Sequence, residues 1–432
     1  MKKICSFLVS LQIIFLLQSA FGGHMESFML KNNIKVIFNK TKGVKVTAVK
    51  IFTPVSVINE TLNNAGISYL TVKLMTQSTN NRSNEILAND IENIGADLSC
   101  DADYDMAGLS MTFLSEYFDK ASGILADVVL NPAFNEKELS FEKQNIIAAL
   151  NSRKDSIGRT ALDEFTKIFY QNTPYAMPVY GTNEAVSKIT REDLIKWHKY
   201  SYNASNILIS VAGNLDKKIV KESLEKYFVQ IPSGTKFEKP IFDIKQSESI
   251  TKKIKGKFNQ AYIIVGFHAP DISNKDFVSV KVANAVLGGR MTSRLFVELR
   301  EKLGLAYEVN AIYPLRREKS YFAIYIGLDK KNIDLTLKKI DEILKDFCTT
   351  EVDEQELKDT KTYIKGLYIM DRQTVSKQAY YYGWREIIGQ GYEYDNRYLK
   401  DVEKVTTKNI IDVANKVFLN HSVTIIINPN AK

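Results

Sequence analysis

The sequence is poor in cysteine and has no concentrated charge of one sign. Of its 432 residues only three are Cys, and Cys5 lies in an N-terminal segment that we expect to be removed. The remaining pair, Cys100 and Cys348, is too small for a disulfide framework, even in an oxidising compartment. The 58 basic and 50 acidic residues give a formal charge of +8, without the basic block interleaved with aromatic residues that is typical of nucleic-acid-binding proteins. The sequence therefore predicts neither a disulfide scaffold nor a nucleic-acid partner.

Only one long apolar run is present, and it lies at the N-terminus. The segment MKKICSFLVSLQIIFLLQSAFGG begins with a Lys pair, continues with an apolar stretch from Ile4 to Leu17, and ends in small residues near Ala20. A membrane anchor is the alternative, but the stretch is shorter than the roughly 20 residues that span a bilayer. We therefore predict a secretory signal peptide at residues 1–22, export to a bacterial periplasm, and no stable membrane insertion of the mature chain.

Familiar catalytic motifs are also missing. There is no G-x-S-x-G nucleophile elbow and no catalytic Cys motif, and the LGGRM segment at Leu287 lacks the spacing of a phosphate-binding loop. No two of the four histidines lie within one helical turn of each other: His24, His198, His268 and His421. We predict that His198 and His421 serve packing or turns, and that His24 lies in a frayed N-terminus.

Strand and helix patterns alternate along the rest of the chain. Residues 28–40 alternate around Asn32 and Asn33, which indicates a hairpin, and residues 44–57 continue as a strand. Helical spacing follows over residues 84–94, 117–130 and 136–154. The chain exceeds the usual size of one domain, so we expect two or more domains of the α+β class.

Two segments of the second half repeat the pattern of segments in the first half. The stretch TREDLIKWHKYSYNASNILISVAGN from Thr190 aligns without a gap on TTKNIIDVANKVFLNHSVTIIINPN from Thr406. The stretch NEKELSFEKQNI from Asn135 aligns on DEQELKDTKTYI from Asp353. Chance matching of helical patterns is the alternative, but two independent segments share nearly the same displacement along the chain. We predict two homologous tandem domains, residues 23–231 and 250–432, joined by the polar linker 232–249.

Three further segments are distinctive: YAMPVYGTNEAVSKITREDL (175–194), NILISVAGNLD (206–216) and LGGRMTSRLFVELREKLGLAYEV (287–309). They resemble the pitrilysin/insulinase peptidase family, close to its bacterial members and to the mitochondrial processing peptidase subunits. The resemblance runs from about residue 27 to the end of the chain. It implies two homologous α+β domains, each a mostly antiparallel sheet packed with helices, that enclose a chamber together with a partner. In active members the first domain holds a zinc ion.

The zinc motif of active members is lost in this sequence. Those members carry H-x-x-E-H on a helix, where two His residues hold the metal and the Glu activates water. The corresponding pattern would begin at Gly66 and places Tyr69, Val72 and Lys73 at the positions of the two ligands and the base. The third ligand of the family, a Glu on a later helix, falls at Ala148 or Ala149. The resemblance therefore implies that this chain holds no metal of its own.

The second half retains a segment that resembles the family's Arg/Tyr pair. Arg300 and Tyr307 lie seven residues apart, with Gly304 between them to permit a tight turn. In the family this pair reaches toward the zinc site and grips the substrate backbone. A guanidinium can donate to peptide carbonyls, and a phenol can donate to an oxyanion that forms beside the metal. A buried Arg with a packed Tyr is the structural alternative.

Together these features favour a chain that is not catalytic alone. It resembles the non-zinc subunit of two-component bacterial peptidases, in which a homologous zinc-bearing partner completes a heterodimer. The chain would bind unstructured peptides through Arg300 and Tyr307, with the peptide added as a strand to a sheet edge. Two alternatives stay open: a proteolytically inactive structural or assembly protein on the same fold, and a metallopeptidase with an unrecognised metal site.

Overall fold

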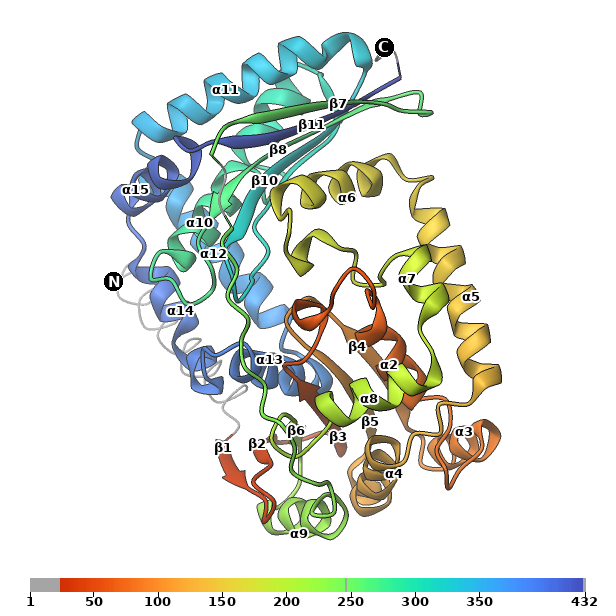
Figure 1. Ribbon diagram of the computed structural model, residues 1–432. Helices are drawn as coiled ribbons and strands as arrows, with labels where there is room; N and C mark the ends of the chain where they lie inside the picture. Colours follow the sequence, from red (N-terminus) through yellow and green to blue (C-terminus); the bar gives the residue numbers. More distant parts are fainter. Residues whose placement is uncertain (1–23, 245–246, 430–432) are drawn as a thin grey trace, which may run out of the picture.

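The computed structural model describes residues 24–244 and 247–429, and it contains one sheet from each half of the chain (Figure 1). The predicted signal peptide lies outside the described residues. Strands of the first sheet follow the order β1-β2-β6-β3-β5-β4, and strands of the second follow β7-β11-β8-β10-β9. Neighbouring strands are antiparallel except for the parallel pairs β2/β6 and β7/β11. The mostly antiparallel α+β architecture predicted from the sequence is confirmed.

The strand bounds are β1 His24–Met29, β2 Lys35–Lys40, β3 Val46–Thr53, β4 Asp97–Ala102, β5 Ala107–Leu114, β6 Leu208–Gly213, β7 Ile250–Lys255, β8 Ala261–Ala269, β9 Ala306–Ile312, β10 Ser320–Leu328 and β11 Ser422–Asn428. The helices of the first half are α2 Ile67–Met75, α3 Asn84–Glu92, α4 Phe118–Leu130, α5 Glu136–Arg153, α6 Ile157–Phe169, α7 Asn183–Lys188, α8 Arg191–Ser201 and α9 Lys217–Phe228. The helices of the second half are α10 Phe277–Leu287, the π-helical η4 Phe296–Lys302, α11 Ile333–Thr349, α12 Glu354–Met370, α13 Val375–Ile387, α14 Asp395–Lys404 and α15 Thr407–Phe418.

Local sequence signals account for most of these bounds. Asn33 has a φ of 67°, as the turn between β1 and β2 requires, so the predicted hairpin is confirmed. The three predicted helices correspond to α3, α4 and α5, with ends shifted by at most two residues. The prediction for His24 is wrong, because His24 is the first residue of β1 and pairs with Lys40 of β2.

The repeated sequence pattern corresponds to repeated structure. Thr190 caps α8 and Thr406 caps α15, and each cap is a reciprocal capping box with the residue three positions later. Helices α5 and α12 start at equivalent points of the repeat, Glu136 and Glu354, and each follows a side-chain cap. The order β2-β6-β3-β5-β4 in the first sheet matches β7-β11-β8-β10-β9 in the second. The predicted duplication is therefore visible in both the helices and the sheet order.

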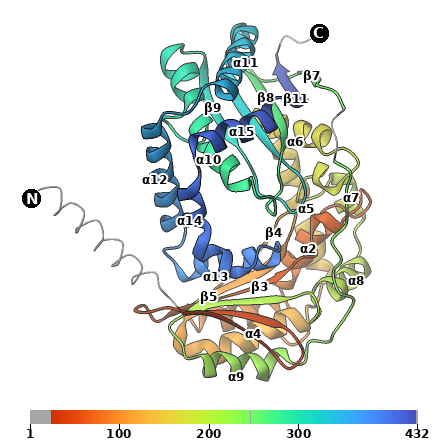
Figure 2. The ribbon, with the colours of Figure 1, turned by 90° about the vertical axis from the view of Figure 1, so that its left-hand side faces the viewer.

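One helix of each half covers the sheet of the other half. Helix α6, from the first half, packs on β8 and β11 of the second sheet, while α13, from the second half, packs on β3 and β6 of the first. Figures 1 and 2 show both helices in these positions. The two helices are equivalent in the repeat, since α6 begins at Ile157 and α13 begins at Val375. This exchange fixes the two halves to each other.

Where α6 and α13 each meet the sheet of the other half, a glycine makes room for an aromatic ring. Gly266 on β8 faces the ring of Phe165 from α6, and Gly383 on α13 faces the ring of Phe52 from β3. A Cβ atom at either glycine would overlap the ring, and both Phe side chains are fully buried. Because the rings fill these positions completely, the two halves share tightly packed contacts.

The connector between α9 and β7 has no helix or strand among its described residues. It is nevertheless tied to both halves. The Phe237 backbone N–H donates to Asn206 Oδ1 at 2.6 Å, and Lys239 Nζ donates to the Arg317 carbonyl at 3.1 Å.

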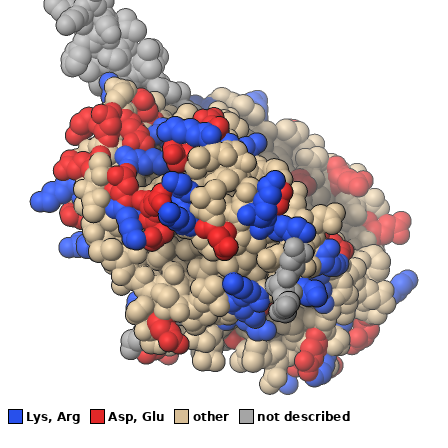
Figure 3. Space-filling view, turned by 90° about the horizontal axis from the view of Figure 1, so that it is seen from above, with Lys and Arg blue, Asp and Glu red and all other residues tan. Residues whose placement is uncertain are grey.

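Basic and acidic side chains are interspersed on the face seen from above in Figure 3. Within residues 24–244 and 247–429, no helix combines the length and apolar character needed to cross a bilayer.

Candidate functional site

Two glycines position helix α2, the helix on which active relatives would carry the zinc motif. Gly66 is the N-cap of α2 with a φ of 95°, and a Cβ there would lie 2.6 Å from the Tyr180 carbonyl oxygen. Gly181 has a φ of 79°, and a Cβ there would overlap the Ala65 carbonyl. Both the left-handed backbone and the close approach require glycine. The start of the motif is thus retained for a structural reason.

A buried carboxylate caps the start of α2. Glu60 Oε2 accepts a hydrogen bond from the Gly66 backbone N–H at 2.8 Å, and Oε1 accepts one from the Ser68 backbone N–H at 2.9 Å. Burial raises the pKa of Glu60 to about 7, although both of these hydrogen bonds act in the opposite direction. The acid therefore satisfies backbone donors that α2 would otherwise leave unpaired.

The first two positions of the degenerate motif serve packing. The Tyr69 ring meets the Tyr180 ring edge-on, with centroids 4.6 Å apart. Val72 is fully buried in the core of the first half. An apolar residue at the position of the catalytic Glu can neither bind a metal nor activate water.

Lys73 places an ammonium group where an active relative would have its second His. Its Nζ lies 3.9 Å from Oε1 of Glu142 on α5, and the Glu142 side chain is only 10% exposed. A Lys carries a positive charge and offers no lone pair while protonated, so it excludes a divalent cation. The Lys73 ammonium supplies the positive charge that the buried Glu142 carboxylate needs.

The predicted third-ligand positions, Ala148 and Ala149, are exposed on α5. Glu142 lies seven residues before Ala149, which is about two helical turns and therefore the same face of the helix. Sequence reasoning missed Glu142, because only the packing of α5 beside α2 brings its carboxylate to Lys73. Among the described residues, no group of three or more His, Cys, Asp or Glu side chains is placed to hold a metal ion.

His198 and His421 lie in different environments. The His198 ring is largely buried, and its Nε2 lies 2.8 Å from the Val129 carbonyl oxygen. Burial lowers the pKa of His198 to about 4, so the ring is neutral at pH 7. The ring packs against those of Phe134 and Tyr202, which confirms the predicted packing role. His421 is exposed at the turn before β11.

Arg300 and Tyr307 lie on the surface of the second half. Arg300 is exposed near the end of η4, with its guanidinium carbon 5.1 Å from the centre of the Phe296 ring. Tyr307 lies on β9, an edge strand of the second sheet, and is 58% exposed. Gly304 between them has a φ of 60°, as the predicted tight turn requires. Neither residue is buried, in contrast to the packing alternative, and their role in substrate binding stays a prediction.

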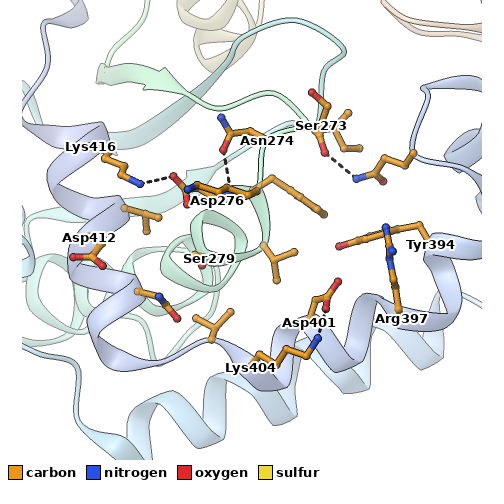
Figure 4. Close-up of a pocket in the computed structure, with 18 of the residues that line it drawn as sticks. Ser273, Asn274, Asp276, Ser279, Tyr394, Arg397, Asp401, Lys404, Asp412 and Lys416 are labelled. Carbon is orange, nitrogen blue, oxygen red and sulfur yellow. Dashed lines mark hydrogen bonds and ion pairs between the residues drawn. The ribbon is translucent and has the colours of Figure 1, made fainter.

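A cavity of about 810 Å³ lies between the loop before α10 and helices α14 and α15 (Figure 4). Lys416 Nζ lies 2.6 Å from Asp276 Oδ2, and Lys404 Nζ lies 3.0 Å from Asp401 Oδ1. These four side chains neutralise one another at the wall of an open groove.

Two family models match consecutive parts of the chain. The model of insulinase (peptidase family M16) matches residues 35–183, and the model of the peptidase M16 inactive domain matches residues 188–364. The chain belongs to the M16 peptidase family. The resemblance inferred from the sequence is therefore confirmed.

Relatives within the M16 family carry different descriptions. A protein of Rickettsia felis called an uncharacterized zinc protease is 28% identical over 410 residues, which cover 93% of this chain and 97% of that protein. A Helicobacter pylori protein called non-peptidase homolog YmxG is 24% identical over 359 residues, or 81% of each chain. The second description agrees with a member that has lost the metal site.

Solved structures share the fold over nearly the whole chain. The peptidase M16 inactive domain from Pseudomonas fluorescens has a TM-score of 0.88 at 21% identity, covering 94% of this chain and 99% of that one. A chain of complex III2 from Candida albicans has a TM-score of 0.81 at 16% identity, covering 93% of this chain and 95% of that one. At these identities the similarity establishes the fold.

Proposed function

We propose that this chain is the non-catalytic, substrate-binding subunit of a two-component zinc peptidase of the periplasm, paired as a heterodimer with a homologous zinc-bearing subunit. The proposal rests on helix α2, which keeps its position but has lost the zinc ligands. The helix keeps its glycine-dependent position, but Lys73 and Glu142 form an ion pair where active relatives bind zinc. A helix that keeps its place without its ligands fits a subunit whose partner supplies the metal.

Substrate binding is assigned to the exposed sheet edges and the Arg/Tyr segment. Among the described strands β4 pairs only with β5, and β9 pairs only with β10, so each has a free edge. A free edge can accept an extended peptide through backbone hydrogen bonds, largely irrespective of its sequence. Tyr307 lies on the edge strand β9 and Arg300 on the helix just before it, where a phenol and a guanidinium could donate to a peptide carbonyl. Unstructured peptides of varied sequence are the expected substrates.

Reconstitution with the zinc-bearing homologue from the same organism tests the proposal. The mixture should cleave a fluorogenic unstructured peptide, whereas this chain alone should not. Arg300→Ala and Tyr307→Phe should each lower kcat/KM of the mixture by on the order of a hundredfold, as expected for loss of a preorganised donor. Lys302→Ala and Tyr117→Phe each alter an exposed side chain of similar chemistry and serve as matched controls.

Two results would contradict the proposal. The first is a stable mixture that cleaves no peptide, and the second is unchanged kcat/KM for both the Arg300 and the Tyr307 variants. Cleavage by this chain alone after zinc loading would instead support the alternative of an unrecognised metal site.

A structural or assembly role is the second candidate function. The fold similarity to a chain of complex III2 favours it, because that chain belongs to a large assembly. Under this alternative the chain would elute from a native extract in a large complex, and disruption of the chain would change the composition of the complex without affecting peptide cleavage.

A further inference from the structure

A second cavity, of about 540 Å³, lies where the two halves of the chain meet. Helices α10, α12 and α13 form most of its wall. The segment after β9 adds Arg316, and Asp103, directly after β4, comes from the first half. The proposed function assigns no role to this cavity.

Most of the charged side chains around the cavity are already paired. Arg372 binds Asp395 through two hydrogen bonds, from Nε at 2.7 Å and from Nη2 at 2.6 Å. Arg316 Nη1 donates to both carboxylate oxygens of Asp103, at 3.1 and 3.2 Å. Arg385 Nε lies 3.6 Å from the same Asp395. Each guanidinium group therefore has a carboxylate of the chain within 4 Å, and Arg372 and Arg385 share Asp395.

Lys281 on α10 is the exception. Its Nζ donates to the Tyr313 carbonyl at 3.1 Å, and within the described part of the chain no carboxylate lies within ion-pair distance of it. Burial and the nearby positive charge of Arg385 both lower the pKa of Lys281, to about 8, so the amine is still mostly protonated at pH 7. An ammonium group without a counter-ion favours an anionic ligand in the adjoining cavity.

Asn284 provides a second donor on the same face of α10. It lies three residues after Lys281, and its Nδ2 is buried without an acceptor among the described residues. Buried donors in folded proteins are nearly always satisfied, so an unpaired one at a cavity wall requires an explanation. A ligand oxygen would supply the missing acceptor.

The cavity wall carries more positive than negative charge. Four cationic side chains line it, Lys281, Arg316, Arg372 and Arg385, against two carboxylates, Asp103 and Asp371. Aromatic side chains also line the cavity, namely Tyr363, Tyr368, Tyr380, Tyr381, Trp384 and Tyr398. The cavity thus combines donors for an anionic group with flat apolar surfaces beside it.

We infer that this cavity binds a carboxylate carried by an aromatic or apolar body, with Lys281 and Asn284 as the donors to its oxygens. The carboxylate has two sources of the same chemistry, a free small acid or the carboxy-terminus of a peptide that ends in an aromatic residue. Tyr380, Tyr381 and Trp384 of α13 contact the apolar body. This inference stands independently of the proposed function.

Titration calorimetry of the full chain tests the site with acetyl-phenylalanine and with its amide, acetyl-phenylalaninamide. The acid should bind and the amide should bind at least tenfold more weakly, since loss of one charge-assisted hydrogen bond costs about that factor. Lys281→Met keeps most of the side-chain length, removes the charge, and should weaken binding of the acid to a similar extent. Lys275→Met, which removes an exposed charge just before α10, should leave binding unchanged.

A pair of heptapeptides that end in Phe, one with a free carboxy-terminus and one amidated, distinguishes the two sources. Tighter binding of the free peptide than of acetyl-phenylalanine identifies a peptide terminus, and equal or weaker binding identifies a small acid. Equal binding of acid and amide forms, or no heat of binding for any acid, would overturn the inference. The comparison of acid and amide uses the unaltered chain, so it holds even if Lys281→Met fails to fold.

Discussion

Replacement of Glu60 should change how the stability of the protein depends on pH. Its carboxyl group is buried at the N-terminus of α2, and its pKa is raised from 4.5 to about 7. Between these two pH values the unfolded chain binds fewer protons at this residue than the folded chain, so the free energy of unfolding falls as pH rises. From pH 5 to pH 8 the loss attributable to Glu60 is about 2 kcal/mol. The contribution is fully present below pH 4.5 and is lost once the pH passes 7.

The Glu60→Gln variant isolates this contribution because an amide does not titrate. Urea unfolding followed by circular dichroism at pH 5, 6, 7 and 8 gives the free energy of unfolding of both proteins. The difference between wild type and variant should shift by about 2 kcal/mol across this range, with the wild type losing stability as pH rises. Glu192→Gln, at an exposed position of α8, should show no such shift. A constant difference between wild type and Glu60→Gln would refute the reasoning that burial dominates at this site.

The remaining predictions concern contacts between elements. Gly383→Val should lower the free energy of unfolding by roughly 1–3 kcal/mol, because the new side chain overlaps the Phe52 ring. Gly366→Ala lies on an open face of α12 and should raise the free energy of unfolding by up to about 1 kcal/mol. Urea unfolding measures both changes, and equal changes for the two variants would contradict the packing argument. Asp395→Asn should cost about 3–5 kcal/mol, since it leaves the buried Arg372 and Arg385 without their carboxylate. A loss below about 1 kcal/mol in the same assay would show that these charges are better solvated than the structure indicates. Lys73→Met should destabilise the protein by about 1 kcal/mol, because the largely buried Glu142 loses its counter-charge. Unchanged stability would show that the Lys73–Glu142 ion pair does not stabilise the protein.

The sequence was sufficient for features that depend on local patterns. The hairpin at Asn33 and the helices α3 to α5 follow from residue type and spacing over a few positions. The duplication was also visible, because matching segments keep the same order of apolar and polar residues. Loss of the zinc motif required only the identities of Tyr69, Val72 and Lys73.

Features that depend on contacts between distant segments were not predicted. Nothing in the local pattern of α6 or α13 shows that each covers the sheet of the other half, since an amphipathic helix has an apolar face whichever sheet it meets. Glu142 becomes significant only once α5 lies beside α2 and brings its carboxylate to Lys73, which is far from it in the sequence. Glu60 appears in the sequence as an ordinary acid, and only burial makes it a cap of α2 with a raised pKa. The cavity around Lys281 likewise forms from segments that are separate in the sequence.

The central claim is that this M16 chain holds no zinc of its own. Dialysis of the purified chain against a small excess of zinc, followed by removal of free metal and elemental analysis, measures the bound zinc per chain. We predict far less than one zinc ion per chain, with no change in Lys73→Met. One tightly bound zinc ion per chain would contradict the account.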